Sequence, residues 1–133
     1  MPSLFVVLFI VSLLPMTLAV IGGYLRLKQF GKFDNNHPRQ QQAQLTGLAA
    51  RVYGAQQNAW EALVFYAVAC MLAFFSSIDL YSLSYAAILF LLCRLLHPIF
   101  YMLNKATFRS LVFFVGWLAN LYIIVKSFLA ISI

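Results

Sequence analysis

The sequence predicts an all-α membrane protein, a four-transmembrane-helix bundle formed by a single domain over residues 1–133. Of these residues, 64% are hydrophobic and 9% are charged, whereas a soluble domain carries about 25% charged residues. The mean hydropathy is +0.90. A chain with so few charges cannot cover itself with polar groups in water, so lipid must solvate most of its surface. Its charged residues also separate four long apolar runs, and each run is long enough to cross a bilayer.

We expect the first helix over residues 4–25, a stretch without a charged side chain. At about 1.5 Å per residue, this stretch crosses a hydrocarbon core of about 30 Å. A cleaved signal peptide is the alternative, but no basic residue precedes the run. The run is also longer than the apolar core of a signal peptide, which has about 7–15 residues. The sequence therefore favours a retained transmembrane helix.

The other three helices are expected over residues 46–75, 80–103 and 109–130. A polar segment over residues 31–44 precedes the second helix, and its turn and helix-breaking residues predict a loop outside the membrane. Shorter turns separate the remaining helices. In such a bundle every backbone polar group in the membrane is paired within its own helix, so no water is needed.

The positions of the basic residues predict the orientation in the membrane. The first and third connections contain Arg26, Lys28, Lys32, Arg39, Lys105 and Arg109. The second connection contains only Asp79. Basic loops stay on the cytoplasmic side, so both termini are expected on the non-cytoplasmic side. Because the cations flank apolar runs and form no stripe on a soluble face, the net charge of +6 does not indicate nucleic-acid binding.

The sequence predicts no metal site and no disulfide. Cys70 and Cys93 lie within apolar runs and far from any CxxC spacing, where they are expected to be small buried hydrophobes. The chain has two histidines and no HExxH motif, so it offers few metal ligands.

Polar residues at membrane depth carry the functional signal, because an ionisable group there costs about 2.5–3.5 kcal/mol and usually marks function. At about 100° per residue, Arg51, Asn58 and Glu61 of the second helix fall within a sector of about 80°. Arg94, His97 and Tyr101 of the third helix fall within about 60°. Arginines at the ends of the first and fourth helices lie on the same side of the membrane. The residues expected to share this cytoplasmic level are Arg26, Arg51, Asn58, Glu61, Arg94, His97, Tyr101 and Arg109.

Each of these residues also has an ordinary structural explanation. The arginines can anchor helix ends at the interface, and Glu61 can pair with one of them inside the bundle. Asn58 can bind a neighbouring helix, and His97 can satisfy a carbonyl that the kink at Pro98 releases. Tyr101 can belong to an aromatic belt. Their common depth favours a shared site over these separate roles.

The excess of cations over carboxylates predicts an anionic ligand, bound partly within the membrane. Guanidinium groups bind carboxylates through a planar fork of donors, and the lone carboxylate Glu61 can hold a ligand amine. A thiol on the ligand would also be activated, because a nearby guanidinium lowers a thiol pKa from about 8.5.

Residues 51–61, RVYGAQQNAWE, resemble the helix-two signature of MAPEG, the membrane-associated proteins in eicosanoid and glutathione metabolism. That signature has an arginine, then Ala-x-x-Asn-x-x-Glu, then an apolar run. The run RLLH at residues 94–97 with Tyr101, followed by Arg109 and Gly116, is similar to the corresponding region of bacterial-type members. The resemblance covers nearly the whole chain.

The resemblance implies a homotrimer in a bacterial inner membrane, with glutathione bound as co-substrate between neighbouring subunits near the cytoplasmic face. Arg109 would be catalytic, by stabilising the glutathione thiolate. The residues implied to bind glutathione are Arg26, Arg51, Asn58, Glu61, Arg94, His97 and Tyr101. Gly54 departs from the pattern, because many eukaryotic members have an arginine there that would contact a carboxylate.

The implied function is that of a microsomal-type glutathione transferase or peroxidase, acting on lipophilic electrophiles or lipid hydroperoxides in the bilayer. Its partners would be membrane lipids and a lipophilic substrate, without nucleic acid. The alternative is a non-catalytic protein of the same fold that binds a ligand or modulates a partner. A small multidrug transporter also has four helices, but its essential glutamate lies in the first helix, and here that helix is uncharged.

Overall fold

The computed structural model describes residues 1–131. Its long helices are α1 (Ser3–Phe30), α3 (Gly47–Phe75), α4 (Ser84–Met102) and α5 (Ala106–Leu129). A 3₁₀ turn, η1 (Leu80–Leu83), leads directly into α4. With η1 counted as part of α4, all four are long and apolar enough to cross a membrane. The chain is therefore an all-α membrane protein with four transmembrane helices, which confirms the predicted fold class.

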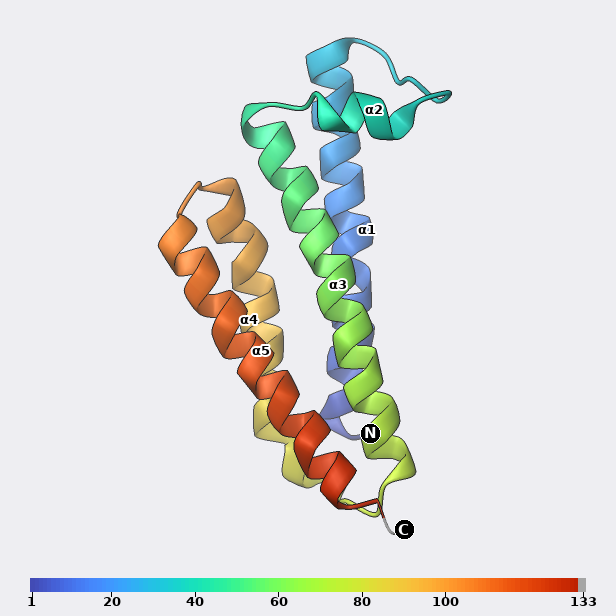
Figure 1. Cartoon of the computed structure of the whole chain (residues 1–133), viewed down its shortest axis with the longest axis vertical. Helices are drawn as coiled ribbons and strands as arrows, with labels where there is room; N and C mark the ends of the chain where they lie inside the picture. Colours follow the sequence, from blue (N-terminus) through green and yellow to red (C-terminus); the bar gives the residue numbers. More distant parts are fainter. Residues whose placement is uncertain (132–133) are drawn as a thin grey trace.

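The bundle consists of two helix pairs (Figure 1). In one pair α1 packs along α3, and in the other α4 packs along α5. Contacts of α3 with both α4 and α5, and of α1 with α4, join the pairs. Both chain ends lie at the same end of the bundle, opposite the short helix α2 (Pro38–Ala43) (Figure 1).

The first helix is longer than its apolar run predicted, because α1 continues beyond residue 25 to Phe30. Arg26 and Lys28 are good helix formers with long side chains that can reach the interface, so their charges do not end the helix. Gly31 ends it instead, with a φ of 74° in the left-handed region that glycine adopts without strain. Its N–H donates to the Leu27 carbonyl and closes the last turn.

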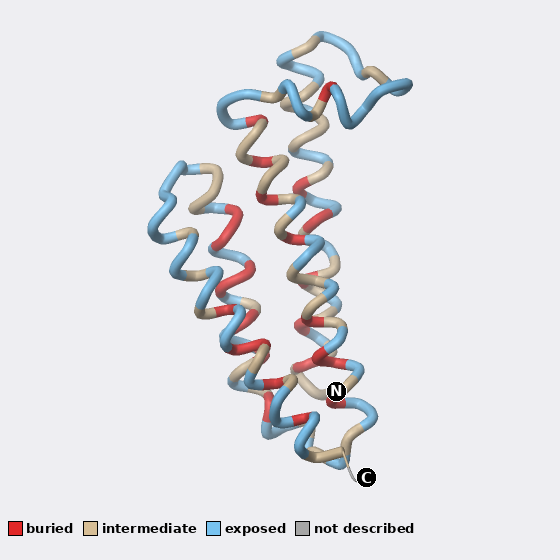
Figure 2. Tube along the Cα trace, in the orientation of Figure 1, coloured by how far each residue is buried: buried red, intermediate tan, exposed pale blue. Residues whose placement is uncertain are grey.

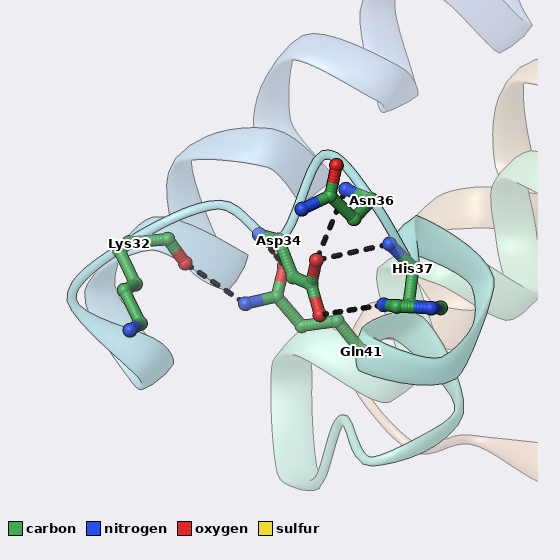
Figure 3. Close-up of polar contacts among 5 residues, drawn as sticks. All are labelled: Lys32, Asp34, Asn36, His37 and Gln41. Carbon is green, nitrogen blue, oxygen red and sulfur yellow. Dashed lines mark hydrogen bonds and ion pairs between the residues drawn. The ribbon is translucent and has the colours of Figure 1, made fainter.

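The segment over residues 31–44 was expected to be a loop, but it contains α2. The Asp34 carboxylate accepts hydrogen bonds from the backbone N–H groups two and three residues further along (Figure 3). The buried side chain of Gln41 donates to the Lys32 carbonyl at 2.8 Å and accepts from the Asp34 N–H at 3.2 Å. These hydrogen bonds between side chain and backbone give the polar segment a defined fold, which its composition did not reveal.

The main apolar core lies toward the end of the bundle that holds the chain termini, where all four long helices meet (Figure 2). Tyr66 of α3 stacks on Phe90 of α4 with ring centroids 4.4 Å apart. Its hydroxyl donates to the Leu4 carbonyl of α1 at 3.1 Å. One buried tyrosine thus joins three helices at this end, and the polar residues predicted for a site lie further toward the opposite end.

Gly116 allows close contact between α5 and α4. A Cβ atom at this position would lie 3.0 Å from the Cβ atom of Cys93, closer than ordinary carbon contacts of about 3.5–4.0 Å. Small residues at such crossings are typical of membrane helix packing.

Replacing Gly116 with valine should therefore lower the thermal unfolding temperature in detergent. The added side chain would force α4 and α5 apart, and overpacking of this kind costs about 1–3 kcal/mol. The matched control is Gly23→Ala, because a Cβ at Gly23 meets no atom within 4 Å and alanine favours the helix. An unchanged unfolding temperature for Gly116→Val would contradict the close approach.

Candidate functional site

A cleft between α3, α4 and α5 has two adjoining parts. The polar hollow, of about 370 Å³, is lined by Gly54, Gln57, Asn58, Glu61, His97, Tyr101, Arg109, Ser110 and Phe113. The aromatic hollow, of about 190 Å³, is lined by Asn58, Glu61, Ala62, Phe65, Phe90, Arg94, Phe113 and Trp117. Three residues, Asn58, Glu61 and Phe113, line both hollows, so a charged compartment lies directly beside a mainly aromatic one.

Helical spacing explains how the polar groups reach this cleft. Asn58 and Glu61 are three residues apart on α3, and His97 and Tyr101 are four apart on α4, so each pair lies on one helix face. Arg109 lies in the first turn of α5. This helix begins at Ala106, earlier than predicted, because residues 106–108 continue the helix instead of forming a turn.

Arg94 is a buried cation between the two helix pairs, with 3% of its surface exposed. Its Nη2 donates to Oδ1 of Asn58 at 2.7 Å and so links α4 to α3. Its Nε has no hydrogen-bond partner within residues 1–131. A guanidinium at membrane depth is costly unless its donors are used. Arg94 therefore brings positive charge and unused donor capacity to the wall of the cleft.

Glu61 is the only carboxylate that lines the cleft in the described part of the chain. It is exposed at the surface of the single chain. The ion pair found within residues 1–131 joins His37 to Asp34, and Glu61 has no cationic partner there. Glu61 therefore does not neutralise an arginine inside the single chain, which was its ordinary structural explanation. Its carboxylate is available to a ligand.

His97 lies between two aromatic rings in the wall of the polar hollow. Its ring is edge-on to Tyr101, with centroids 5.7 Å apart, and is tilted against Phe113. The side chain is buried, and Nδ1 has no partner in the described residues. This nitrogen therefore does not bind a carbonyl released at Pro98, which was the ordinary structural explanation for His97.

Arg109 is held against the ring of Tyr101. Its Cζ atom lies 4.4 Å from the ring centroid, a cation–π contact worth about 0.5–2 kcal/mol. Both residues line the polar hollow. The contact keeps the guanidinium beside the cavity, in the helical turn where the N–H groups of α5 add positive potential.

Two of the residues predicted for the site lie elsewhere in the single chain. Arg51 donates from Nε to the Met102 carbonyl at 3.1 Å, so it ties α3 to the carboxyl end of α4. Arg26 lines a separate hollow of about 200 Å³ between α1, α3 and the segment around α2. Its guanidinium lies 4.7 Å above the ring of Phe33. The structure thus brings six of the eight together: Asn58, Glu61, Arg94, His97, Tyr101 and Arg109.

The aromatic residues that line the aromatic hollow were not among the predicted site residues. Phe113 and Trp117 follow Arg109 at intervals of four residues, and this spacing could have placed them on the same face of α5. Trp117 stacks nearly parallel to Phe65 of α3, with centroids 6.4 Å apart. Among residues 1–131, no group of three or more His, Cys, Asp or Glu side chains is arranged to hold a metal ion.

Asn58→Ala should destabilise the protein in detergent, because it would remove the hydrogen bond to a buried cation. Hydrogen bonds to charged groups contribute about 1.5–3 kcal/mol. Asn58→Asp keeps an acceptor for Arg94 and should preserve more of the unfolding temperature than Asn58→Ala. If the alanine variant unfolds at the temperature of the parent, the bond does not stabilise the contact between α3 and α4.

The comparisons with known proteins agree with this architecture. The MAPEG family model matches residues 3–129, and this match includes every helix that contributes to the cleft. No curated protein and no solved structure matches the chain. The family assignment thus rests on a match over almost the full sequence, together with four membrane-spanning helices. The chain belongs to the MAPEG family.

Proposed function

We propose that this protein is a glutathione-dependent transferase or peroxidase of the membrane, acting on lipophilic electrophiles or lipid hydroperoxides. Membership in the MAPEG family indicates a membrane function related to glutathione or eicosanoids. The observation that best supports this activity is that the polar hollow adjoins the aromatic hollow along α3 and α5, at Asn58, Glu61 and Phe113. A charged thiol and an apolar acceptor could meet where the two hollows join.

The chemistry of the polar hollow fits glutathione as co-substrate. Glutathione has one amine, two carboxylates and one thiol. Glu61 can accept hydrogen bonds from the amine, and Gln57 and Asn58 can bind amide or carboxylate groups. Arg109 can stabilise the thiolate by charge. The proposal requires no metal ion.

Arg109 would act by favouring loss of the thiol proton to solvent. Lowering the thiol pKa by two units from about 8.5 corresponds to about 2.7 kcal/mol and leaves mostly thiolate at neutral pH. The amino end of α5 contributes about half a positive charge in the same direction. The resulting thiolate is a nucleophile that faces the aromatic hollow.

Two reactions follow from such a thiolate. With an electrophile, sulfur forms a bond to carbon and the leaving group departs with its electron pair. With a hydroperoxide, sulfur attacks the terminal oxygen and the O–O bond breaks. This gives a sulfenic acid and an alkoxide, which takes a proton from solvent and becomes an alcohol. A second glutathione then reduces the sulfenic acid, giving glutathione disulfide and water. In both reactions the apolar acceptor would be held by Phe65, Phe113 and Trp117.

We propose a homotrimer for this protein, as the family resemblance implies. Arg26 lines a hollow on a different side of α3 from the cleft. It could contact glutathione only from a neighbouring subunit that placed its α1 against the cleft. This arrangement would complete the predicted set of contacts without moving any helix within the chain.

Arg109→Ala and Glu61→Gln should affect the reaction in different ways. Arg109→Ala should abolish the ultraviolet absorbance of bound thiolate and the turnover of a generic aryl halide, with glutathione affinity nearly unchanged. Glu61→Gln should weaken binding, because it removes the negative charge opposite the ligand amine, and a hydrogen bond to a charged group contributes about 1.5–3 kcal/mol. Calorimetry and absorbance of the purified protein measure both. Lys126→Ala removes a cation near the far end of α5 and is the matched control.

The same measurements distinguish the proposed enzyme from the non-catalytic alternative and test the roles of Arg109 and Glu61. Glutathione binding without thiolate or turnover in the parent protein would favour the non-catalytic alternative. Thiolate that persists in Arg109→Ala would make Arg109 an interface anchor. Parent-like affinity in Glu61→Gln would remove the carboxylate from the site.

We also propose that both termini face the non-cytoplasmic side of a bacterial inner membrane. Both chain ends lie at one end of the bundle, and the connections rich in basic residues belong to the other end (Figure 1). A reporter that is active only in the cytoplasm should therefore be silent when fused after residue 133. The same reporter inserted between residues 35 and 36, in the connection between α1 and α2, should be active. The reverse pattern would invert the topology and place the cleft at the opposite face.

A further inference from the structure

Gly54 lies in the α3 wall of the polar hollow, beside the end of the Tyr101 side chain from α4. A Cβ atom at Gly54 would lie 2.5 Å from the hydroxyl oxygen of Tyr101 and 2.8 Å from its Cζ atom. Ordinary contacts between carbon atoms are about 3.5–4.0 Å. The end of the Tyr101 side chain therefore occupies the space that any side chain at position 54 would need.

Tyr101 also contacts residues that matter for the chemistry of the hollow. Its ring carries the guanidinium of Arg109 at 4.4 Å and packs edge-on to His97. One end of the tyrosine thus reaches α3 at Gly54, while its ring supports a cation of α5. A single side chain therefore contacts both Gly54 and Arg109.

The placement of a glycine here is otherwise unfavourable. Gly54 lies well inside α3, and a glycine within a helix is less stable than an alanine because it loses more backbone entropy on folding. Local helix preference therefore does not explain Gly54. The space that it leaves for Tyr101 gives a physical reason for this residue.

We propose that Gly54 and Tyr101 form a steric pair that positions Arg109 at the polar hollow. The proposal rests on the proposed function, in which Arg109 stabilises the thiolate, and it makes Tyr101 a positioning residue that acts through Arg109. It also explains why position 54 is a glycine here, where many eukaryotic members have an arginine. The arginine of many eukaryotic members cannot occupy position 54 while Tyr101 keeps this conformation, so Gly54 is more than a lost carboxylate contact.

The test combines Gly54→Ala, Tyr101→Leu and the double variant in a cycle. The readout is the pH at which the bound glutathione thiol ionises, followed by thiolate absorbance in the detergent-purified protein. Gly54→Ala should raise that pH by about one unit, a tenfold loss of thiolate fraction well below the midpoint. Tyr101→Leu should have a similar effect, and the double variant should add little to either, because both changes release the same contact.

Gly54→Arg distinguishes the steric role of Gly54 from the simple absence of an arginine that binds a carboxylate. If position 54 merely lacks a carboxylate contact, Gly54→Arg should strengthen glutathione binding and leave the thiolate intact. The steric pair predicts loss of thiolate instead. Tyr122→Leu is the control, since Tyr122 also carries a cation over its ring, Lys126 at 5.9 Å, but lies outside the cleft. Unchanged thiolate in Gly54→Arg, or additive effects in the cycle, would overturn the proposal.

A second measurement is independent of glutathione. A cation above an aromatic ring has its side-chain NMR signals shifted by the ring current, so the Arg109 side chain should show such a shift in the isotope-labelled parent protein. The shift should disappear in both Gly54→Ala and Tyr101→Leu. Persistence of the shift in Gly54→Ala would refute the steric pair even if the parent forms thiolate. A parent without thiolate but with the expected loss of shift would refute only the proposed function.

Discussion

A buried guanidinium joins the two helix pairs at the level of the cleft. Arg94 is almost fully buried, and neither lipid nor apolar side chains can accept hydrogen bonds from its guanidinium. Polar groups of the protein must therefore accept them. Asn58 supplies one of them from α3. That hydrogen bond fixes α3 relative to α4, and both hollows of the cleft open beside it. The placement of the other polar groups, including Glu61 one turn further along α3, depends on this contact.

The two ends of the bundle have different physical tasks. At the end with the chain termini, Tyr66 and Phe90 stack, and a hydroxyl to carbonyl bond closes the contact with α1. The aromatic hollow begins beside this stack at Phe90, and the polar hollow lies further toward the opposite end, among cationic and amide groups. Stability from close packing at one end allows the other end to keep open, polar volume within a small membrane protein.

Much of this architecture could be predicted from the sequence. The apolar runs defined four spans, and helical periodicity placed Asn58 with Glu61 and His97 with Tyr101 on common faces. Other features depend on tertiary contacts that no local pattern contains. Arg51 shares the helix face of Asn58, yet it binds a carbonyl at the end of α4. The order of the segment around α2 depends on hydrogen bonds of Asp34 and Gln41, whose residue types alone favoured a loop.

The arginines show why residue type and depth are insufficient to assign a role. Arg94 is buried and donates a hydrogen bond to the amide of Asn58, so it mainly stabilises the contact between α4 and α3. Arg51 donates a hydrogen bond to the Met102 carbonyl and so stabilises the carboxyl end of α4. Within residues 1–131, the partner of the Arg109 guanidinium is an aromatic ring, and Arg109 lines the polar hollow, so its charge remains available to an anion. A cation that is held in place by a ring, and not neutralised by a carboxylate, keeps its full electrostatic effect on a thiol. The identity of the partner, more than the presence of the charge, therefore decides which arginine can support catalysis.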